Sequence, residues 1–157
     1  MPRLPAALLL TTLLMASAGC SSSDEETPPA CLGSPSVYLE ALKRAPGEVR
    51  LEGGTPISEC LASDQEPAEL GRVGEAIVEA ATELNAAARR DPAGEDTVQL
   101  GYLVGAVQRG AAGTNGIHAD LVRRLDAAAR FNEGGETLPV SFERAFGRGY
   151  AAGQETG

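Results

Sequence analysis

The stretch "SDQEPAELGRVGEAIVEAATELNAAARRDP", residues 63–92, decides the fold class. Apolar residues recur in it at steps of three and four, which places them on one face of a helix. They are Leu70, Val73, Ile77, Ala81, Leu84 and Ala88. Ser63 and Glu66 have the spacing of a capping box, the pair Arg89-Arg90 suits the negative end of a helix, and Asp91-Pro92 ends it. The stretch therefore predicts one long amphipathic helix.

Three further helices are expected downstream. One spans about 96–112, one spans about 114–130 with Thr114 or Asn115 as its cap, and the last opens at Pro139. The side chains expected to face the core are Leu100, Leu103, Val104, Val107, Ala111, Ile117, Leu121, Leu125, Ala128, Phe142, Phe146 and Tyr150, joined by Leu138 and Val140. The pattern predicts an all-α fold, a small antiparallel bundle of about four main helices.

The segment before these helices, residues 31–63, has a weaker pattern. A short helix is expected over about 34–44, and residues 49–52 alternate in the manner of a strand. Pro56 argues against regular strand pairing, because proline lacks the backbone donor that a sheet requires. We therefore expect an irregular segment or one short ribbon here.

The N-terminus has the order of parts of a secretory signal. Arg3 precedes an apolar run from Ala6 to Met15, which at ten residues is too short to span a bilayer. Small residues follow the run. Of these, Ala16-Ser17-Ala18 fits an ordinary signal peptidase site, which would release a soluble protein beginning at Gly19.

The same residues allow a second interpretation. Ser17-Ala18-Gly19-Cys20 resembles the lipobox of bacterial lipoproteins, in which small residues precede a cysteine that is diacylated and becomes the new N-terminus. Ser17 stands where that family usually has Leu, Val or Ile. Residues 21–29 are polar, acidic and proline-bearing, as expected of a disordered tether. The resemblance implies lipidation at Cys20 and anchoring to a membrane.

Cysteine parity favours the lipoprotein interpretation. The chain has three cysteines, and export would place them in an oxidising compartment where pairs are expected. If Cys20 carries the lipid, Cys31 and Cys60 remain as one disulfide pair; if it does not, one cysteine is left over. A Cys31–Cys60 bond would close a loop of about 30 residues and add roughly 3 to 4 kcal/mol of stability.

These signals divide the chain into four parts. We expect a signal peptide at 1–19, a tether at 20–30, a helical domain at 31–153 and a tail at 154–157. Without residues 1–19 the chain carries 12 basic and 22 acidic residues, a net charge of −10. Such a charge repels phosphates, so nucleic acid is not an expected partner.

The sequence offers little catalytic chemistry. His118 is the only histidine, and no serine lies in a G-x-S-x-G context. One histidine and two disulfide-bonded cysteines do not make a metal site, and no calcium-binding loop of the EF-hand type is present. We therefore expect no catalytic residue, metal or cofactor, and a His118-dependent hydrolase is kept only as a lesser alternative.

Glycine is the most distinctive feature of the helical part. Residues 101–105 and 149–153 both have the form G-Y-x-x-G, inside predicted helices. A glycine in a helix interior costs about 1 kcal/mol relative to alanine, so a compensating interaction is expected. Close helix crossing, which we favour, would supply it. The alternatives are chance repetition and a groove, which would involve a set of four residues: Tyr102, Gly105, Tyr150 and Gly153.

Three functional hypotheses follow. The first is an exported protein, lipid-anchored to the cell membrane or to the outer membrane of a two-membrane cell, whose non-enzymatic helical domain binds an envelope protein. The second is a carrier of a small apolar or lipidic ligand held between helices. The third is the hydrolase that uses His118.

Overall fold

The computed structural model describes residues 26–114, 116–132, 134 and 137–157. Every regular element in these ranges is a helix, and none is a strand. In chain order they are the 3-10 turn η1 (Pro29–Leu32), α1 (Pro35–Leu42), the 3-10 turns η2 (Glu52–Gly54) and η3 (Ile57–Cys60), α2 (Pro67–Ala88), α3 (Glu95–Ala111), α4 (Ala119–Ala128) and α5 (Val140–Thr156). The predicted all-α fold is confirmed.

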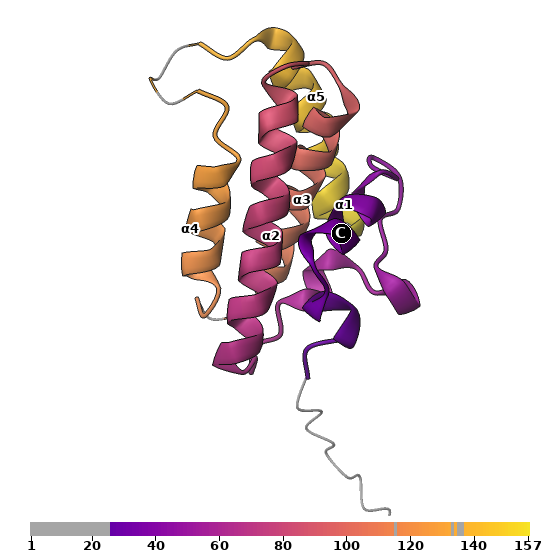
Figure 1. The fold of residues 1–157 in the computed structure, drawn as a ribbon, viewed down its shortest axis with the longest axis vertical. Coiled ribbons are helices and arrows are strands. Elements are labelled where there is room, and N and C mark those ends of the chain that lie inside the picture. The colour runs from indigo at the N-terminus through magenta and orange to yellow at the C-terminus, as the bar shows by residue number, and fades with distance from the viewer. Residues whose placement is uncertain (1–25, 115, 133, 135–136) are drawn as a thin grey trace, which may run out of the picture.

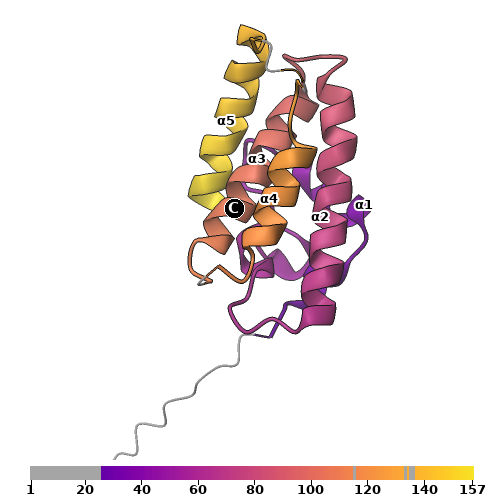
Figure 2. The same ribbon diagram turned by 90° about the vertical axis from the view of Figure 1, so that its left-hand side faces the viewer.

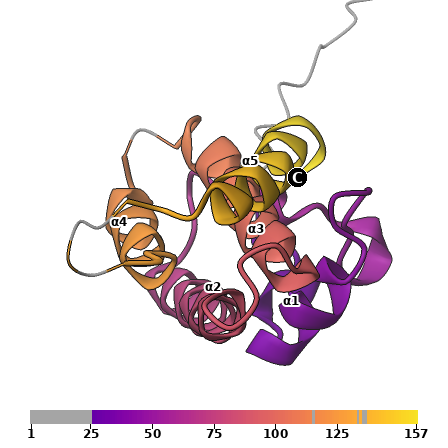
Figure 3. The same ribbon diagram turned by 90° about the horizontal axis from the view of Figure 1, so that it is seen from above.

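The four long helices form a bundle in which successive helices run in opposite directions (Figure 1). Figure 2 shows α4 beside α2 on the face turned toward the viewer, with α5 at the other edge. Viewed from above, α3 lies in the middle, with α2, α4 and α5 around it (Figure 3). Since helices alternate in direction, α3 and α5 run parallel to each other.

Helix α2 matches most of the stretch that predicted it, but it starts without the predicted cap and ends at Ala88, before Arg89-Arg90. The helix begins at Pro67 and ends at Ala88, but its N-cap is Glu66, and no side chain caps it. The predicted capping box from Ser63 to Glu66 is therefore wrong. A proline disfavours helical backbone in the residue before it, so Pro67 keeps Glu66 extended and sets the start of the helix.

Helix α4 is shorter than predicted. The sequence suggested a start at Thr114 or Asn115, of which Asn115 lies outside the described residues, whereas the helix begins at Ala119 with His118 as its N-cap. Gly116 has a φ of +86°, a left-handed conformation that interrupts a helix. Ile117 consequently falls in a turn and is 40% exposed rather than buried.

The core contains most of the predicted apolar positions. Its fully buried members include Leu42, Val49, Ile57, Val73, Ile77, Leu100, Leu103, Val107 and Leu125. Val140, a candidate for this core, is instead 64% exposed, because it occupies the first turn of α5 and points to solvent.

The N-terminal segment is irregular, as expected, and the predicted Cys31–Cys60 disulfide is confirmed. The Tyr38 hydroxyl donates to the Cys31 carbonyl at 2.7 Å, so α1 holds the same cysteine through its backbone. Residues 49–56 turn through a Leu51–Thr55 backbone hydrogen bond without forming a ribbon. The segment is thus fixed to the bundle at both ends of the disulfide loop.

The C-terminus belongs to the domain. Helix α5 continues to Thr156, so the prediction of a separate 154–157 tail is wrong. Arg50 donates to the Thr156 carbonyl at 2.7 Å and Arg109 to the Gln154 carbonyl at 3.1 Å. Both guanidinium groups satisfy carbonyls that a helix end leaves unpaired, and their charge suits its negative end.

The tether prediction also needs correction at its end. Thr27 is buried and its hydroxyl accepts a hydrogen bond from Gln65, so the fixed part of the chain begins before Cys31. A search of the described helices for one long and apolar enough to cross a membrane finds none.

Candidate functional site

The G-Y-x-x-G repeats bring α3 and α5 into backbone contact. Each glycine of the repeats faces the main chain of the opposite helix, so that a Cβ on Gly101 would lie 2.9 Å from the Tyr150 nitrogen. The reciprocal pair is Gly149, where a Cβ would lie 2.9 Å from the Tyr102 nitrogen. Side chains larger than hydrogen would force the two helices apart.

The groove that was the alternative interpretation of these repeats is closed at the glycines. At Gly105 the space for a side chain is taken by the Tyr150 backbone, and at Gly153 it is taken by the Tyr102 backbone. The structure therefore brings Tyr102, Gly105, Tyr150 and Gly153 together as packing, which is the interpretation favoured from sequence. The close approach also places Cα–H groups against carbonyl oxygens, a contact that recurs at tight helix pairs.

The two tyrosines of the repeats point to different surroundings. Tyr102 is fully buried, and its hydroxyl forms a hydrogen bond of 2.8 Å with the Thr156 hydroxyl, which ties α3 to the end of α5. Tyr150 is half-buried, and its hydroxyl donates to Gln108 at 2.7 Å. Only Tyr150 faces the side of the bundle where α4 lies.

His118 is fully buried in a polar network that Gln65 links to Thr27, close to the start of the described chain. Gln65 donates to the Thr27 hydroxyl at 2.8 Å and to the Cys60 carbonyl at 3.1 Å, so its oxygen is the acceptor for His118 Nε2 at 2.9 Å. The proton of the neutral ring is therefore on Nε2. Nδ1 is buried without a partner in the described ranges.

The surroundings of His118 favour the neutral imidazole ring. Burial lowers the pKa of His118, because the charged imidazolium loses its hydration. The imidazole ring hydrogen-bonds the Gln65 amide, which is neither a nucleophile nor a carboxylate. His118, the N-cap residue of α4, is thus linked through Gln65 to Thr27 near the start of the described chain.

An aromatic ladder runs along the α4 side of α5. The Phe142 and Phe146 rings stack with centroids 5.5 Å apart, and Tyr150 continues the row 6.3 Å from Phe146. Phe131, which follows α4, tilts against Phe142 at 4.3 Å. Of these rings only Phe142 is fully buried, so the ladder presents aromatic surface to the outside.

Phe131, Phe142 and Phe146 of the ladder form one wall of a largely apolar pocket of about 570 Å³. Its lining consists of Ala129, Arg130, Phe131, Asn132, Leu138, Phe142, Glu143 and Phe146. We call it the aromatic pocket. Its volume lies in the range of small-molecule sites, and its wall of phenylalanine with a few polar groups at the edge is typical of a binding pocket.

Side chains at the C-terminal end of α2 hold the end of α4 in place beside the aromatic pocket. The Asn85 amide donates to the Ala128 and Arg130 carbonyls at 2.8 and 2.9 Å, and Arg89 donates to the same Arg130 carbonyl at 2.9 Å. These bonds satisfy carbonyls at the C-terminal end of α4. They fix the point from which the chain continues to Phe131.

A second, smaller pocket lies toward the other end of α4. Its volume is about 310 Å³ and its lining is Gln108, Ala111, Ala112, Gly116, Ala119 and Val122. A polar bridge separates the two pockets: Gln108 accepts from Tyr150 and donates to Asp126 at 3.1 Å. The bridge joins α5, α3 and α4 across the space between the two pockets.

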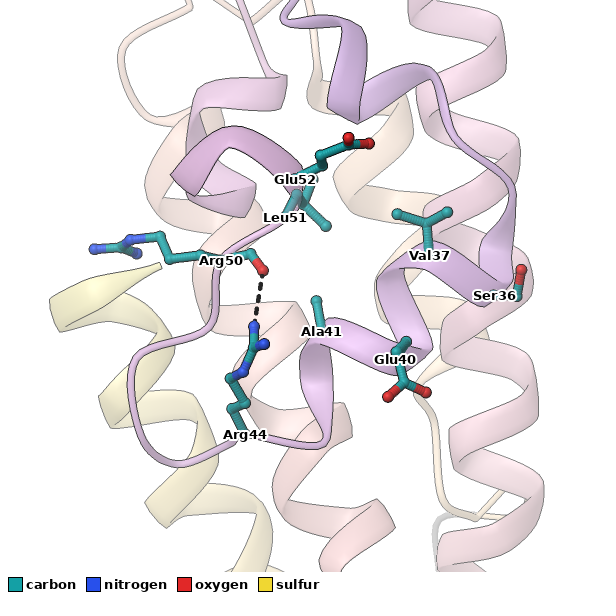
Figure 4. Close-up of a pocket in the computed structure, with 8 residues that line it drawn as sticks. All are labelled: Ser36, Val37, Glu40, Ala41, Arg44, Arg50, Leu51 and Glu52. Carbon is teal, nitrogen blue, oxygen red and sulfur yellow. Dashed lines mark hydrogen bonds between the residues drawn. The ribbon is translucent and has the colours of Figure 1, made fainter.

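A third hollow, of about 400 Å³, lies between α1 and residues 50–52 (Figure 4). Arg44 closes one side by donating to the Arg50 carbonyl at 3.3 Å, while the Arg50 side chain points away toward α5. Glu40 on its rim is paired with Lys43. Val37, Ala41 and Leu51 give it a small apolar floor, far less aromatic than the ladder.

The remaining predicted site residues fall in two groups. Cys20, the predicted lipidation site, lies outside the described residues. Cys31 and Cys60 form the disulfide. The described part of the chain holds no group of three or more His, Cys, Asp or Glu side chains placed to hold a metal ion.

The sequence did not predict the aromatic pocket, although its spacing placed Phe142, Phe146 and Tyr150 on one face of the last helix. The spacing of four residues was the available signal. It predicted burial in the core and gave no sign that α4 leaves these rings partly uncovered or that Phe131 joins them. Comparisons with protein-family models, curated proteins and solved structures find no match for this chain.

Proposed function

We propose that this protein is an exported lipoprotein, anchored through Cys20, whose non-enzymatic helical domain binds an envelope partner at the aromatic pocket. The observation that carries the binding proposal is the partly uncovered row of Phe131, Phe142, Phe146 and Tyr150. Exposed aromatic surface beside a formed hollow is enriched at interaction sites, because its burial is favourable and loses little side-chain entropy.

The aromatic pocket lies far from the point where the tether would leave the domain, which supports binding of a partner away from the anchoring membrane. The described chain begins at the lower end of Figure 1, and the connection from α4 to α5 lies at the upper end. Helix α2, which has 22 residues, spans the distance between them, or about 33 Å. A tether leaving the lower end would leave the aromatic pocket facing the space beyond the membrane surface.

The confirmed disulfide supports export. Structural disulfides persist in oxidising compartments, and the Cys31–Cys60 bond uses two of the three cysteines. Cys20 is then the cysteine left for the lipid. The lipobox-like residues before it provide the support for lipidation.

A carrier of a small apolar ligand is the second candidate, because the same pocket has a volume suited to one. The His118 hydrolase has no comparable support, since the histidine is buried against Gln65.

Two experiments test the proposal. Cells given an alkyne-tagged fatty acid should label the wild-type protein and should not label Cys20→Ser, which should also leave the membrane fraction. A crosslinked pull-down from the envelope should then enrich a protein with the wild type and lose it with Phe146→Ala. An unlabelled wild-type protein would refute the anchor, and an extractable lipid or small molecule in place of a protein partner would favour the carrier.

A further inference from the structure

Two hollows lie along α4, the aromatic pocket at its C-terminal end and the smaller pocket toward its N-terminal end, with the Tyr150–Gln108–Asp126 bridge between them. Helix α4 packs against α2, and α5 packs against α3, while contacts between α4 and α5 themselves are sparse over the described residues. Figure 3 shows the two helices on either side of α3. In a helical bundle, the position over one helix and between two others is where a further helix lies.

One face of α4 lines this space from end to end. Ala119 and Val122 line the smaller pocket, Asp126 belongs to the polar bridge, and Ala129 lines the aromatic pocket. These residues are three or four positions apart, so they share one face of the helix. The two pockets are therefore separated by about 10 to 15 Å along α4.

Along α4 the lining is apolar in one pocket, polar at the bridge and apolar in the other pocket. This order indicates which class of molecule can bind there. A lipid chain laid across both pockets would cover Gln108 and Asp126 with methylenes, which removes water from polar groups and gives nothing in exchange. An extended peptide would lack partners for its backbone, because the described part of the structure offers no strand edge. A helix satisfies its own backbone and can place a polar side chain between two apolar ones.

The negative charge of this chain favours a positively charged occupant. The mature chain has a net charge of −10, which attracts a basic partner over long range. At short range, Asp126 faces the middle of the space and Glu143 lines its upper end. Arg130 is the one basic residue of the aromatic pocket, and it lies at the C-terminal end of α4.

We infer that the occupant is a basic amphipathic helix of another envelope protein. It lies between α4 and α5 with large apolar side chains seven to ten residues apart in the two pockets. A lysine or arginine between these anchors meets Asp126, and a carboxylate near one end meets Arg130. This inference rests on the proposed function, since it names the partner class for the same aromatic pocket.

Site-specific photocrosslinking in the native envelope tests the geometry. A photoreactive phenylalanine analogue replaces Phe146 in one strain and Val122 in another, and Glu79, exposed on α2, serves as the control position. Both groove positions should capture the same protein. The attachment points, mapped by mass spectrometry, should fall seven to ten residues apart in one basic amphipathic segment.

The captured segment, made as a synthetic peptide, is then titrated against the mature protein carrying Cys20→Ser. Phe146→Ala and Val122→Glu should each weaken binding at least tenfold, and Thr82→Ala on α2 should leave it unchanged. Thermal melting shows that each variant is folded. A peptide bound equally well by all four proteins would overturn the inference.

The crosslinking also separates this inference from the proposed function. A lipid adduct, a second copy of this chain, attachment points in unrelated segments, or no capture from either groove position would overturn the helix inference. Capture of a protein from Glu79 alone would leave a partner-binding lipoprotein but move its interface to α2. If the wild-type protein were not attached to the membrane and none of the three crosslinking positions captured a protein, the proposed function would be refuted as well.

Discussion

Replacing Gly149 with alanine should destabilise the protein, although alanine is the better helix former. Gly149 lies inside α5 against the Val98 carbonyl of α3, and its Cβ would lie 2.9 Å from the Tyr102 nitrogen. The matched control is Gly147, two residues earlier in the same helix, where a Cβ meets nothing within 4 Å. The two substitutions add the same methyl group to the same helix and differ only in what that group touches.

The magnitudes follow from these surroundings. Alanine gains about 1 kcal/mol of helix propensity at either position. Added volume in a packed interface costs about 1 to 3 kcal/mol, and the upper end applies at Gly149 because a helix carbonyl cannot rotate away. We therefore expect a net loss of about 2 kcal/mol for Gly149→Ala and a gain of about 1 kcal/mol for Gly147→Ala.

Thermal and urea unfolding of the mature protein carrying Cys20→Ser measure both variants. For a domain of this size, 1 kcal/mol corresponds to a change in Tm of roughly 3 to 5 °C. Gly149→Ala should melt about 6 to 10 °C lower than the parent, and Gly147→Ala about 3 to 5 °C higher. If Gly149→Ala were as stable as Gly147→Ala, the close approach of α3 and α5 would be disproved.

Three further predictions concern the rest of the fold. His118 has a lowered pKa, so the unfolded chain binds more protons once the pH falls below about 6.5, and stability should drop as the pH decreases through that window. His118→Gln should reduce the drop, measured by urea unfolding at pH 7.5 and 5.5; an unchanged pH profile would contradict the assignment. Replacing Cys31 and Cys60 with serine should lower the free energy of unfolding by roughly 3 to 4 kcal/mol in the same assay. A loss below about 1 kcal/mol would show that the disulfide contributes little to stability. Asn85→Ala should cost about 1 to 3 kcal/mol and speed amide exchange at the end of α4, whereas exposed Thr82→Ala should change neither.

The sequence was sufficient to predict the long helices because their apolar stripes depend on local spacing. The stripe from Val73 to Ala88 is buried as expected, Leu70 is only partly buried, and α2 ends at Ala88, just before the predicted stop at Asp91-Pro92. The same periodicity failed at Ile117. The pattern there continues through Gly116, whose left-handed backbone breaks the helix and turns the isoleucine outward.

Local spacing patterns did not predict the contacts between segments that are distant in the sequence. The hydrogen bonds of Gln65 to Thr27 and His118 join residues 38 and 53 positions apart. The disulfide was predictable because cysteine chemistry limits the choice of partners. A glutamine has no such restriction, so its partners emerge only from the packed structure.

The glycine pairing and the uncovered aromatic ladder have one cause. Phe142, Phe146 and Tyr150 follow one stripe of α5, and Ala145, Gly149 and Gly153 follow the neighbouring stripe, which is buried against α3. Because the glycines hold α5 against the α3 backbone, α5 cannot also move across to pack on α4. The helix propensity lost at the glycines thereby keeps the space beside the aromatic rings open. Gly149→Ala should consequently disturb partner binding at Phe146 as well as stability, even though the substituted residue faces the opposite helix.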